Sequence, residues 1–349
     1  MPRTTAPTRP RLDDVAERSG VAKSTVSRVL NNYTKNFTIR DEVRQRVLDA
    51  AKELGFEPNP FVRSLRAKKT NLIALIGLRD FGWSSRGTDE AAINRMLERF
   101  SEHAYDVSST FLGPNRDQYA PPRWRVDGII VVSSDYHSQL DKLDRSGTPY
   151  VCVNGPAARH GASVVANDPQ GTQLAINHLR QLGHERIAFL KTRYSEQHPI
   201  EPDHHVSSRT RLNAYIEAMN ANGLQPMDCA NDYSLTAEQG VRAAIEDYGA
   251  TAILSYHHVM AIQHMSAIQR MGLSIPDDVS LICFNDAFPC EEVNPPLTCI
   301  SVPGETMGEA AATLLLRWMD KGSIDANDRI IHVDESLIVR ESTAPPKGA

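Results

Sequence analysis

The sequence lacks the features that mark several classes of protein. No apolar run approaches the roughly 18–20 residues that a membrane-spanning helix needs. The N-terminal stretch MPRTTAPTRPRLDD contains no apolar core of a signal peptide. The five cysteines are odd in number and form no CxxC pair, which argues against a disulfide framework or a zinc site. The sequence therefore predicts reduced thiols, no bound metal, and a cytoplasmic protein without membrane contact.

Enzyme signatures are absent as well. The chain contains no GxSxG nucleophile motif, and it contains neither GxGxxG nor GxxxxGK[ST], the glycine-rich loops that hold phosphates. These absences predict a protein that is not an enzyme and that needs no cofactor. An enzyme built on other chemistry stays open as one alternative, and a simple ligand-binding protein stays open as another.

Charge is distributed unevenly along the 349 residues. Residues 1–70 contain 15 Lys and Arg against 8 Asp and Glu, a net charge of +7, whereas the remainder carries −12. A basic N-terminal part on an acidic body is typical of nucleic-acid-binding proteins. A solvated surface with a chance imbalance would give the same totals.

The basic part contains three helical patterns in quick succession. Leu12, Val15 and Ala16 form one apolar stripe that ends at Gly20, a residue suited to a helix C-terminus. The stretch VAKSTVSRVLNN follows at once, and a third amphipathic pattern runs to Gly55. Two helices joined by so tight a turn have the spacing of a helix-turn-helix motif. An ordinary helical hairpin with a polar face is the alternative.

In a helix-turn-helix motif the second helix enters the major groove of DNA. Small hydroxyl side chains can approach phosphates closely, and cations can reach guanine edges. The predicted base contacts are Lys23, Ser24 and Arg28. The predicted phosphate contacts are Thr25, Ser27, Asn31 and Arg63. Residues 58–70 follow as a linker with room for two helical turns at most, a length that is marginal in water.

From residue 71 onward, short apolar runs alternate with helical patterns. This alternation predicts parallel sheets covered by helices on both faces, and the length favours two doubly wound lobes with a ligand crevice at the strand ends. The predicted divisions are a disordered arm at 1–10, a helix-turn-helix domain at 11–57, a linker at 58–70, a core at 71–343 and a tail at 344–349. The first lobe is expected at 71–166 and 299–329, and the second at 167–298 and 330–343.

Short motifs occur along the whole sequence. Near the N-terminus they are DVA, STVSRVLN, ELGF and RSL. Through the body they are NDPQG, LGHERIAFL, RLNAY, GLSIPDDVSLICFND and IVRES. In this order the motifs resemble those of the lac repressor family of bacterial transcription regulators. The resemblance spans roughly residues 11–342 and implies a small all-α DNA-binding head joined to a two-lobed α/β sensor similar to periplasmic sugar-binding proteins.

The resemblance also implies roles for particular residues. Leu65, in the linker, matches the residue that wedges into the minor groove when two subunits lie side by side on DNA. A plain linker whose Leu65 packs on the body is the alternative. Arg211, Asn285 and the pair Asn167-Asp168 match effector contacts. Many family members have Asp where this chain has Asn285, and Asn-Asp where it has His257-His258. The two histidines are interpreted either as effector ligands with pH sensitivity near neutral or as structural residues.

Two weaker effector contacts, Trp83 and Ser134, follow apolar runs of the first lobe. Taken together, the sequence predicts a homodimeric regulator, acting as a repressor, that binds a near-palindromic operator in double-stranded DNA on the nucleoid. A small molecule related to sugars would bind between the lobes and set operator affinity. The polar, proline-containing end ESTAPPKGA offers no apolar heptads, so a dimer is expected instead of a tetramer joined through a C-terminal helix.

Overall fold

A computed structural model describes residues 10–31, 39–57, 69–77, 87–109, 121–122, 124–132, 137–193, 205–231 and 233–348. The chain divides into two compact units, Met1–Asn71 and Leu72–Ala349. Four of the predicted contacts, Arg63, Leu65, Trp83 and Ser134, lie outside the described residues, as does most of the predicted linker. Those assignments stay predictions.

The first unit is built from helices α1 (Leu12–Ser19), α2 (Lys23–Leu30) and α3 (Asp41–Leu54). Its core is small and consists of Val15, Val26, Val29, Val47, Ala50 and Ala51, all buried. Gly20 and Gly55 end α1 and α3 at φ of 63° and 62°. That left-handed backbone favours glycine, so both predicted helix ends are confirmed.

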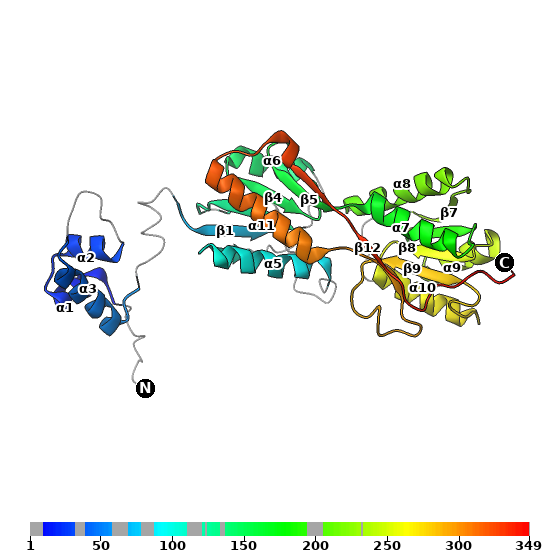
Figure 1. Cartoon of the computed structure of the whole chain (residues 1–349), viewed down its shortest axis with the longest axis horizontal. Helices are drawn as coiled ribbons and strands as arrows, with labels where there is room; N and C mark the ends of the chain where they lie inside the picture. The colour runs from blue at the N-terminus through cyan, green and yellow to red at the C-terminus, as the bar shows by residue number, and fades with distance from the viewer. Residues whose placement is uncertain are drawn as a thin grey trace, which may run out of the picture. The chain divides into compact units, whose positions relative to one another are not determined.

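The second unit contains two six-stranded sheets (Figure 1). In order across the first sheet lie β11 (Ile330–Val333), β5 (Ala162–Ala166), β4 (Tyr150–Val153), β3 (Gly128–Val132), β1 (Leu72–Ile76) and β2 (Asp106–Ser109). Across the second lie β12 (Ser336–Ile338), β10 (Thr298–Ser301), β9 (Ser280–Phe284), β8 (Ala252–Ser255), β6 (Ile187–Leu190) and β7 (Met227–Ala230). All neighbours are parallel except β10 and β12. The predicted pair of parallel sheets is confirmed.

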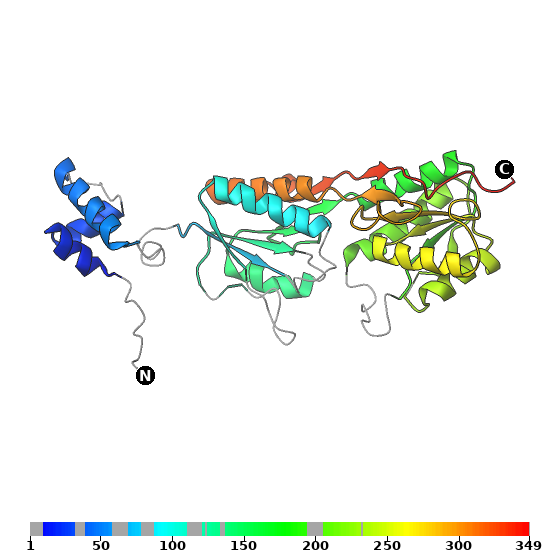
Figure 2. The ribbon, with the colours of Figure 1, turned by 90° about the horizontal axis from the view of Figure 1, so that it is seen from below.

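Helices cover both faces of each sheet, which explains why the central strands are apolar throughout. On the first sheet, α5 (Thr88–Glu102) and α11 (Gly304–Lys321) pack side by side on one face, and α6 (His137–Ser146) lies on the other (Figures 1 and 2). On the second, α7 (Asp168–Gln181) packs with α8 (Val206–Ala221). The opposite face carries α9 (Ala237–Arg242), the π-helical turn Ala243–Asp247 and α10 (His258–Arg270).

The chain passes between the two lobes at three points, which we call the crossovers. The first is Asn167, between β5 and α7; the second is Val302–Pro303, between β10 and α11; the third is Asp334–Glu335, between β11 and β12. The predicted lobe boundaries at 298/299 and 329/330 are wrong, because β10 belongs to the second sheet and β11 to the first. Both strands have four residues; β11 is at the edge of its sheet and β10 is next to the edge strand β12. Pairing of β10 with β9 and of β11 with β5, not the apolar pattern of either strand, decides which sheet each joins.

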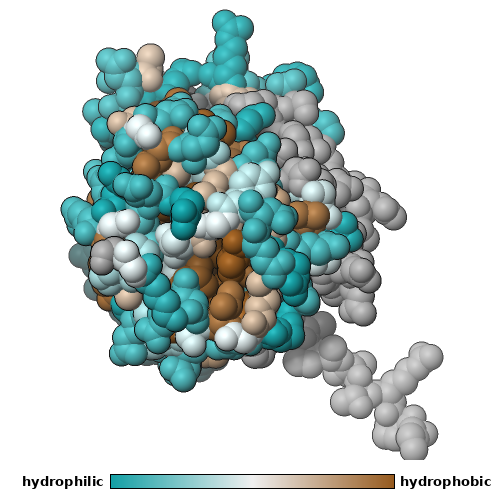
Figure 3. Space-filling model, turned by 90° about the vertical axis from the view of Figure 1, so that its right-hand side faces the viewer, coloured by the Kyte–Doolittle hydropathy of each residue, from teal (hydrophilic) through white to brown (hydrophobic). Residues whose placement is uncertain are grey.

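No helix among the described residues is long and apolar enough to cross a bilayer. Figure 3 shows one face of the molecule, where apolar side chains reach the surface in a patch among polar ones. Folded proteins commonly expose that much apolar surface, so the patch by itself assigns no partner.

Candidate DNA-binding and ligand-binding sites

Helix α2 presents the predicted DNA contacts on its outer surface. Val26 and Val29 are buried and hold the helix to α1 and α3. Lys23 and Ser24 are exposed, and Thr25, Ser27 and Arg28 are partly exposed. The same helix therefore separates a packed apolar side from a side rich in hydroxyls and cations, which is the arrangement that groove binding requires.

Lys23 and Asn31 have side-chain partners within the unit. Lys23 Nζ lies 2.7 Å from Oδ1 of Asp13 on α1, and both side chains are more than half exposed. Exposed ion pairs of this kind contribute little to stability, so Lys23 can exchange Asp13 for another acceptor readily. Asn31 ends α2, and its Nδ2 donates to the Ser27 carbonyl oxygen at 2.6 Å.

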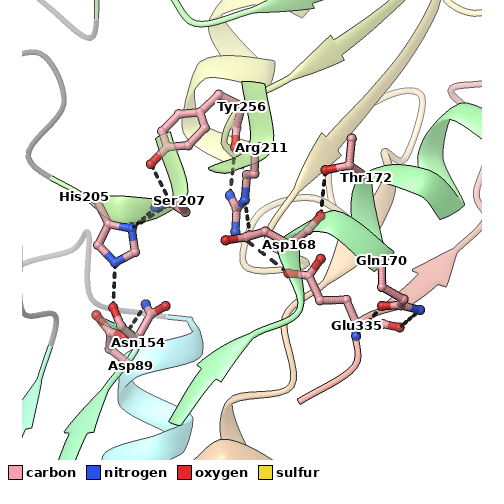
Figure 4. Close-up of polar contacts among 10 residues, drawn as sticks. All are labelled: Asp89, Asn154, Asp168, Gln170, Thr172, His205, Ser207, Arg211, Tyr256 and Glu335. Carbon is pink, nitrogen blue, oxygen red and sulfur yellow. Dashed lines mark hydrogen bonds and ion pairs between the residues drawn. The ribbon is translucent and has the colours of Figure 1, made fainter. Parts of the chain in front are cut away.

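The second site is centred on Arg211, which projects from α8 and is 5% exposed (Figure 4). Its Nε donates to Asp168 Oδ1 at 2.6 Å, and its Nη1 donates to the Tyr256 carbonyl oxygen at 3.0 Å. The guanidinium also lies 4.0 Å from the centre of the Phe284 ring. Burial disfavours its charged form, but the carboxylate of Asp168 contributes most to offsetting this, and the pKa of Arg211 is raised.

A second carboxyl group, which the sequence interpretation did not single out, completes this cluster. Glu335 Oε1 lies 3.9 Å from Arg211 Nη2, and the Glu335 side chain is fully buried. Neither of its carboxyl oxygens has a hydrogen-bond partner among the described residues. Burial raises the pKa of Glu335 to about 8, Arg211 opposes this rise, and Asp168 adds to it. Glu335 is therefore largely protonated at neutral pH.

Hydrogen bonds tie the first and third crossovers together at this site. Asn167 Nδ2 donates to Asp334 Oδ1 at 2.7 Å. Gln170, in the first turn of α7, accepts from the Glu335 backbone N–H at 2.9 Å and donates to the Glu335 carbonyl oxygen at 3.2 Å. The Arg211 cluster therefore lies where the connections between the lobes meet, so a change at Arg211 reaches those connections directly.

Comparison with known proteins identifies two domains. A family model described as bacterial regulatory proteins, lacI family, matches residues 11–59, and one described as a periplasmic binding protein-like domain matches residues 176–343. The chain therefore has a lacI-family DNA-binding domain followed by a periplasmic binding protein-like domain. It is a DNA-binding transcriptional regulator with a ligand-binding domain.

Two relatives of this regulator and one solved structure match nearly its whole length. The transcriptional regulator DegA of Bacillus subtilis is 29% identical over 95% of this chain and 97% of DegA. The transcriptional repressor PurR of Mannheimia succiniciproducens is 28% identical over 95% of this chain and 98% of PurR. The lac repressor dimer bound to operator and the anti-inducer ONPF shares the fold, with 22% identity, a TM-score of 0.76, and 97% and 100% of the two chains covered. These relatives are transcriptional regulators and not enzymes, which confirms the prediction that the chain is not an enzyme.

The regulator also contains a chain of hydrogen bonds that joins its two lobes beside Arg211 (Figure 4). Asn154 follows β4 of the first lobe, and its Nδ2 donates to Asp89 Oδ1 at 3.0 Å. Its carbonyl oxygen lies 2.8 Å from Nε2 of His205, the N-cap of α8 in the second lobe. His205 Nδ1 lies 2.6 Å from Ser207 Oγ, which in turn lies 2.9 Å from the Tyr256 hydroxyl. The sequence interpretation missed these residues, because only the fold brings them together.

The predicted histidine pair lies at the start of α10 in the regulator. His257 Nδ1 accepts from the Val259 backbone N–H and so caps the helix, and the two imidazole rings are 4.3 Å apart. Burial lowers the pKa of both, and for His257 the neighbouring His258, Arg211 and His205 lower it further. Both shifts favour the neutral imidazole, because burial removes the water that would solvate the charged ring.

The remaining predicted contact, Asn285, directly follows β9 and has a φ of 68°. Its backbone N–H donates to the Ile300 carbonyl oxygen at 2.9 Å, which holds the residue at the end of the second sheet. A separate surface hollow of about 400 Å³ is lined by α5 side chains, including Glu90, Asn94 and Arg95, and by Glu305. None of the predicted effector contacts that the structure describes lines this hollow, which sets it apart from the Arg211 cluster.

Proposed function

We propose that this regulator is a homodimeric repressor that binds a near-palindromic operator through α2 of each subunit. Lys23, Ser24 and Arg28 would contact bases, because they lie on the outer side of a helix anchored by Val26 and Val29. Thr25, Ser27, Asn31 and Arg63 would contact phosphates, and Leu65 would enter the minor groove. Operator binding would place the regulator on the nucleoid.

The DNA half of the proposal is tested by selecting bound sequences from a random pool of duplex DNA. The full chain should enrich a near-palindromic site. Arg28→Ala removes one bidentate base contact in each of the two subunits, so it should weaken binding to that site by about 30-fold or more. Leu65→Ala should weaken it too. Arg46→Ala, which removes an exposed cation of α3, is the matched control. Equal losses in Arg28→Ala and Arg46→Ala would contradict base reading by α2. Sedimentation with the selected site should give two chains per duplex; four would contradict the dimer.

We further propose that the effector is a neutral, hydroxyl-rich molecule related to sugars. The observation that carries this proposal is the buried cluster around Arg211. Asp168 already balances the guanidinium charge at 2.6 Å, and Glu335 is largely protonated, so the cluster has little net charge to attract an ion. It does offer fixed donors and acceptors, which suit the fork-like hydrogen bonds of adjacent hydroxyl groups. Asn285, Asn167, His257 and His258 would add polar contacts.

Effector binding would act through the crossovers. In the present structure the Arg211 guanidinium is bonded to protein groups, so an effector has to exchange some of these bonds for its own. The first and third crossovers lie beside this site, because Asp168 and Gln170 follow the first and Glu335 is part of the third. Such an exchange of bonds would therefore change the arrangement of the two lobes. The effector can shift operator affinity only as far as it prefers one arrangement of the lobes over the other.

A thermal-shift screen of neutral sugars, acidic sugars and nucleobases tests the ligand class. A neutral sugar should raise the unfolding temperature of the native chain, and the rise should disappear in Arg211→Lys, which keeps the charge but loses the planar fork. Arg242→Lys, on an exposed ion pair of α9, is the matched control and should respond like the native chain. A response restricted to charged ligands would contradict the neutral class.

A further inference from the structure

Three cysteine thiols converge in the second lobe, although their spacing along the chain follows no metal-binding motif. Cys283 lies in β9, Cys299 lies in β10, and Cys290 lies in the loop 285–297 that joins the two strands. Their Sγ atoms all lie within 4.8 Å of one another. Each residue is at most 1% exposed. Among the residues that the structure describes, this is the only group of three or more side chains that could share a metal ion.

The backbone fixes all three positions. Cys283 and Cys299 are direct partners in the parallel register of β9 and β10, and their Sγ atoms are 3.5 Å apart. Cys290 is held from both sides: its N–H donates to the Ala287 carbonyl oxygen at 2.9 Å, and its carbonyl oxygen accepts from the Leu297 N–H at 2.8 Å. The three sulfurs are therefore placed by sheet pairing and loop hydrogen bonds, which gives a preorganised set of ligands.

Polar groups border the thiols on two sides. Arg340 Nη1 lies 3.7 Å from Cys299 Sγ, and the same guanidinium makes two bonds to Asp286, at 2.7 and 3.0 Å. This cation would offset part of the negative charge that thiolate ligands bring. On another side, His258 is buried, interacts electrostatically with Cys290, and has an Nδ1 atom without a partner in the described part of the chain.

We propose that Cys283, Cys290 and Cys299 form a binding site for one soft, thiophilic metal ion of low coordination number, such as Cu(I). Thiolate ligands select soft ions. A metal–sulfur distance of about 2.3 Å in a trigonal arrangement requires sulfurs about 4 Å apart. The Cys283 and Cys299 sulfurs lie 3.5 Å apart and all three lie within 4.8 Å of one another, so small side-chain rotations would bring them to that spacing. Zinc prefers four ligands, and among the residues that the structure describes three side-chain ligands converge within 4.8 Å.

Metal binding at this site has two consequences. The thiols release up to three protons as they become ligands, so the affinity for the ion should rise with pH. The ion would also tie the loop 285–297 to β9 and β10. That loop begins with Asn285 and Asp286, so the ion would act beside the proposed effector site without occupying it. The site does not depend on the proposed function, because no DNA or sugar takes part in it.

The test is an anaerobic titration of the full chain with Cu(I), in competition with a chromophoric Cu(I) chelator. One ion per chain should bind, with an ultraviolet sulfur-to-copper charge-transfer band and a higher unfolding temperature. Cys290→Ala should lower the affinity by about 100-fold or more, since even groups outside the ligand set change affinity by about 10–100-fold. Cys152→Ala, which removes a buried thiol of the first lobe, is the matched control and should bind normally.

X-ray absorption of the copper-loaded native chain tests the site without any variant that could misfold. Three sulfur neighbours around copper are expected. Two sulfurs, a nitrogen in their place, or no stoichiometric binding would overturn the proposal and leave three cysteines that simply fill the core. Equal losses of Cu(I) affinity in Cys290→Ala and Cys152→Ala would also overturn the proposal. Tighter binding of Zn(II) than of Cu(I) would overturn it too.

Discussion

Glu335 makes the stability of the regulator depend on pH in an unusual direction. A typical carboxylate stabilises a protein as pH rises, because its partners lower its pKa. Here burial raises the pKa of Glu335 from 4.5 to about 8, so the folded chain holds a proton that the unfolded chain releases. The contribution of Glu335 to the free energy of unfolding should be largest at and below pH 4.5. This contribution should fall as the pH rises from 4.5 to about 8.

The structure sets the size of this effect. Each pKa unit corresponds to about 1.4 kcal/mol, so a rise from 4.5 to about 8 corresponds to at most about 5 kcal/mol. Glu335→Gln replaces the protonated acid by a neutral group of the same shape. The variant should match the native chain near pH 5 and exceed its stability by up to that amount near pH 8.

Urea unfolding followed by circular dichroism at several pH values between 5 and 8.5 would measure the difference. Glu341→Gln, which changes an exposed glutamate a few residues along the chain, is the control and should follow the native curve. Parallel curves for the native chain and Glu335→Gln would refute the reasoning. A variant that is less stable at pH 8 would show instead that Glu335 is ionised and stabilised by Arg211.

Three further changes test the packing around the two sites. In Gly171→Ala, the new Cβ would lie 1.6 Å from Glu335 Oε2, so the carboxyl group should be displaced and the fall in stability between pH 5 and 8 should disappear from urea titrations. Arg211→Ala leaves Asp168 buried without its cation and should lower the free energy of unfolding by about 3–5 kcal/mol; a loss below about 1 kcal/mol would contradict the importance of this pair. Val26→Ala should destabilise the first unit by about 1–3 kcal/mol and weaken DNA binding, while the calorimetric transition of Leu72–Ala349 stays in place.

The sequence predicted best those features that depend on local pattern. The helix ends at Gly20 and Gly55 follow from glycine at positive φ, and the central strands follow from continuous apolar runs. The strands β5 and β7 were not among the predicted apolar runs. The sequence of β5, ASVVA, contains a serine and follows a turn with Gly155 and Gly161, and β7 carries the polar Asp228 and gives no continuous apolar run.

The ligand-binding cluster was predicted only in part, because its members come from distant segments. Arg211 and Asp168 were predicted through the resemblance, yet nothing local indicates that they bond to each other, and Glu335 was not predicted at all. For Glu335 the sequence shows only an acidic residue between two short strands, a pattern typical of a surface turn. Its position between the lobes becomes evident only when the two strands are assigned to different sheets. The convergence of Cys283, Cys290 and Cys299 was hidden for the same reason: sheet register brings them together, not spacing.

The three crossovers impose an order on how the protein forms during synthesis. The first lobe consists of residues 72–166 together with a later segment that includes α11 and β11, so its sheet cannot be completed until residue 333 has left the ribosome. By then, nearly all of the second lobe has already emerged, although it precedes those last pieces of the first. Residues 72–166, which carry β1 to β5, therefore keep the α5 face exposed until α11 is made, more than 200 residues later. Chaperone dependence should accordingly be greater in this regulator than in a protein of equal size whose lobes are continuous in sequence.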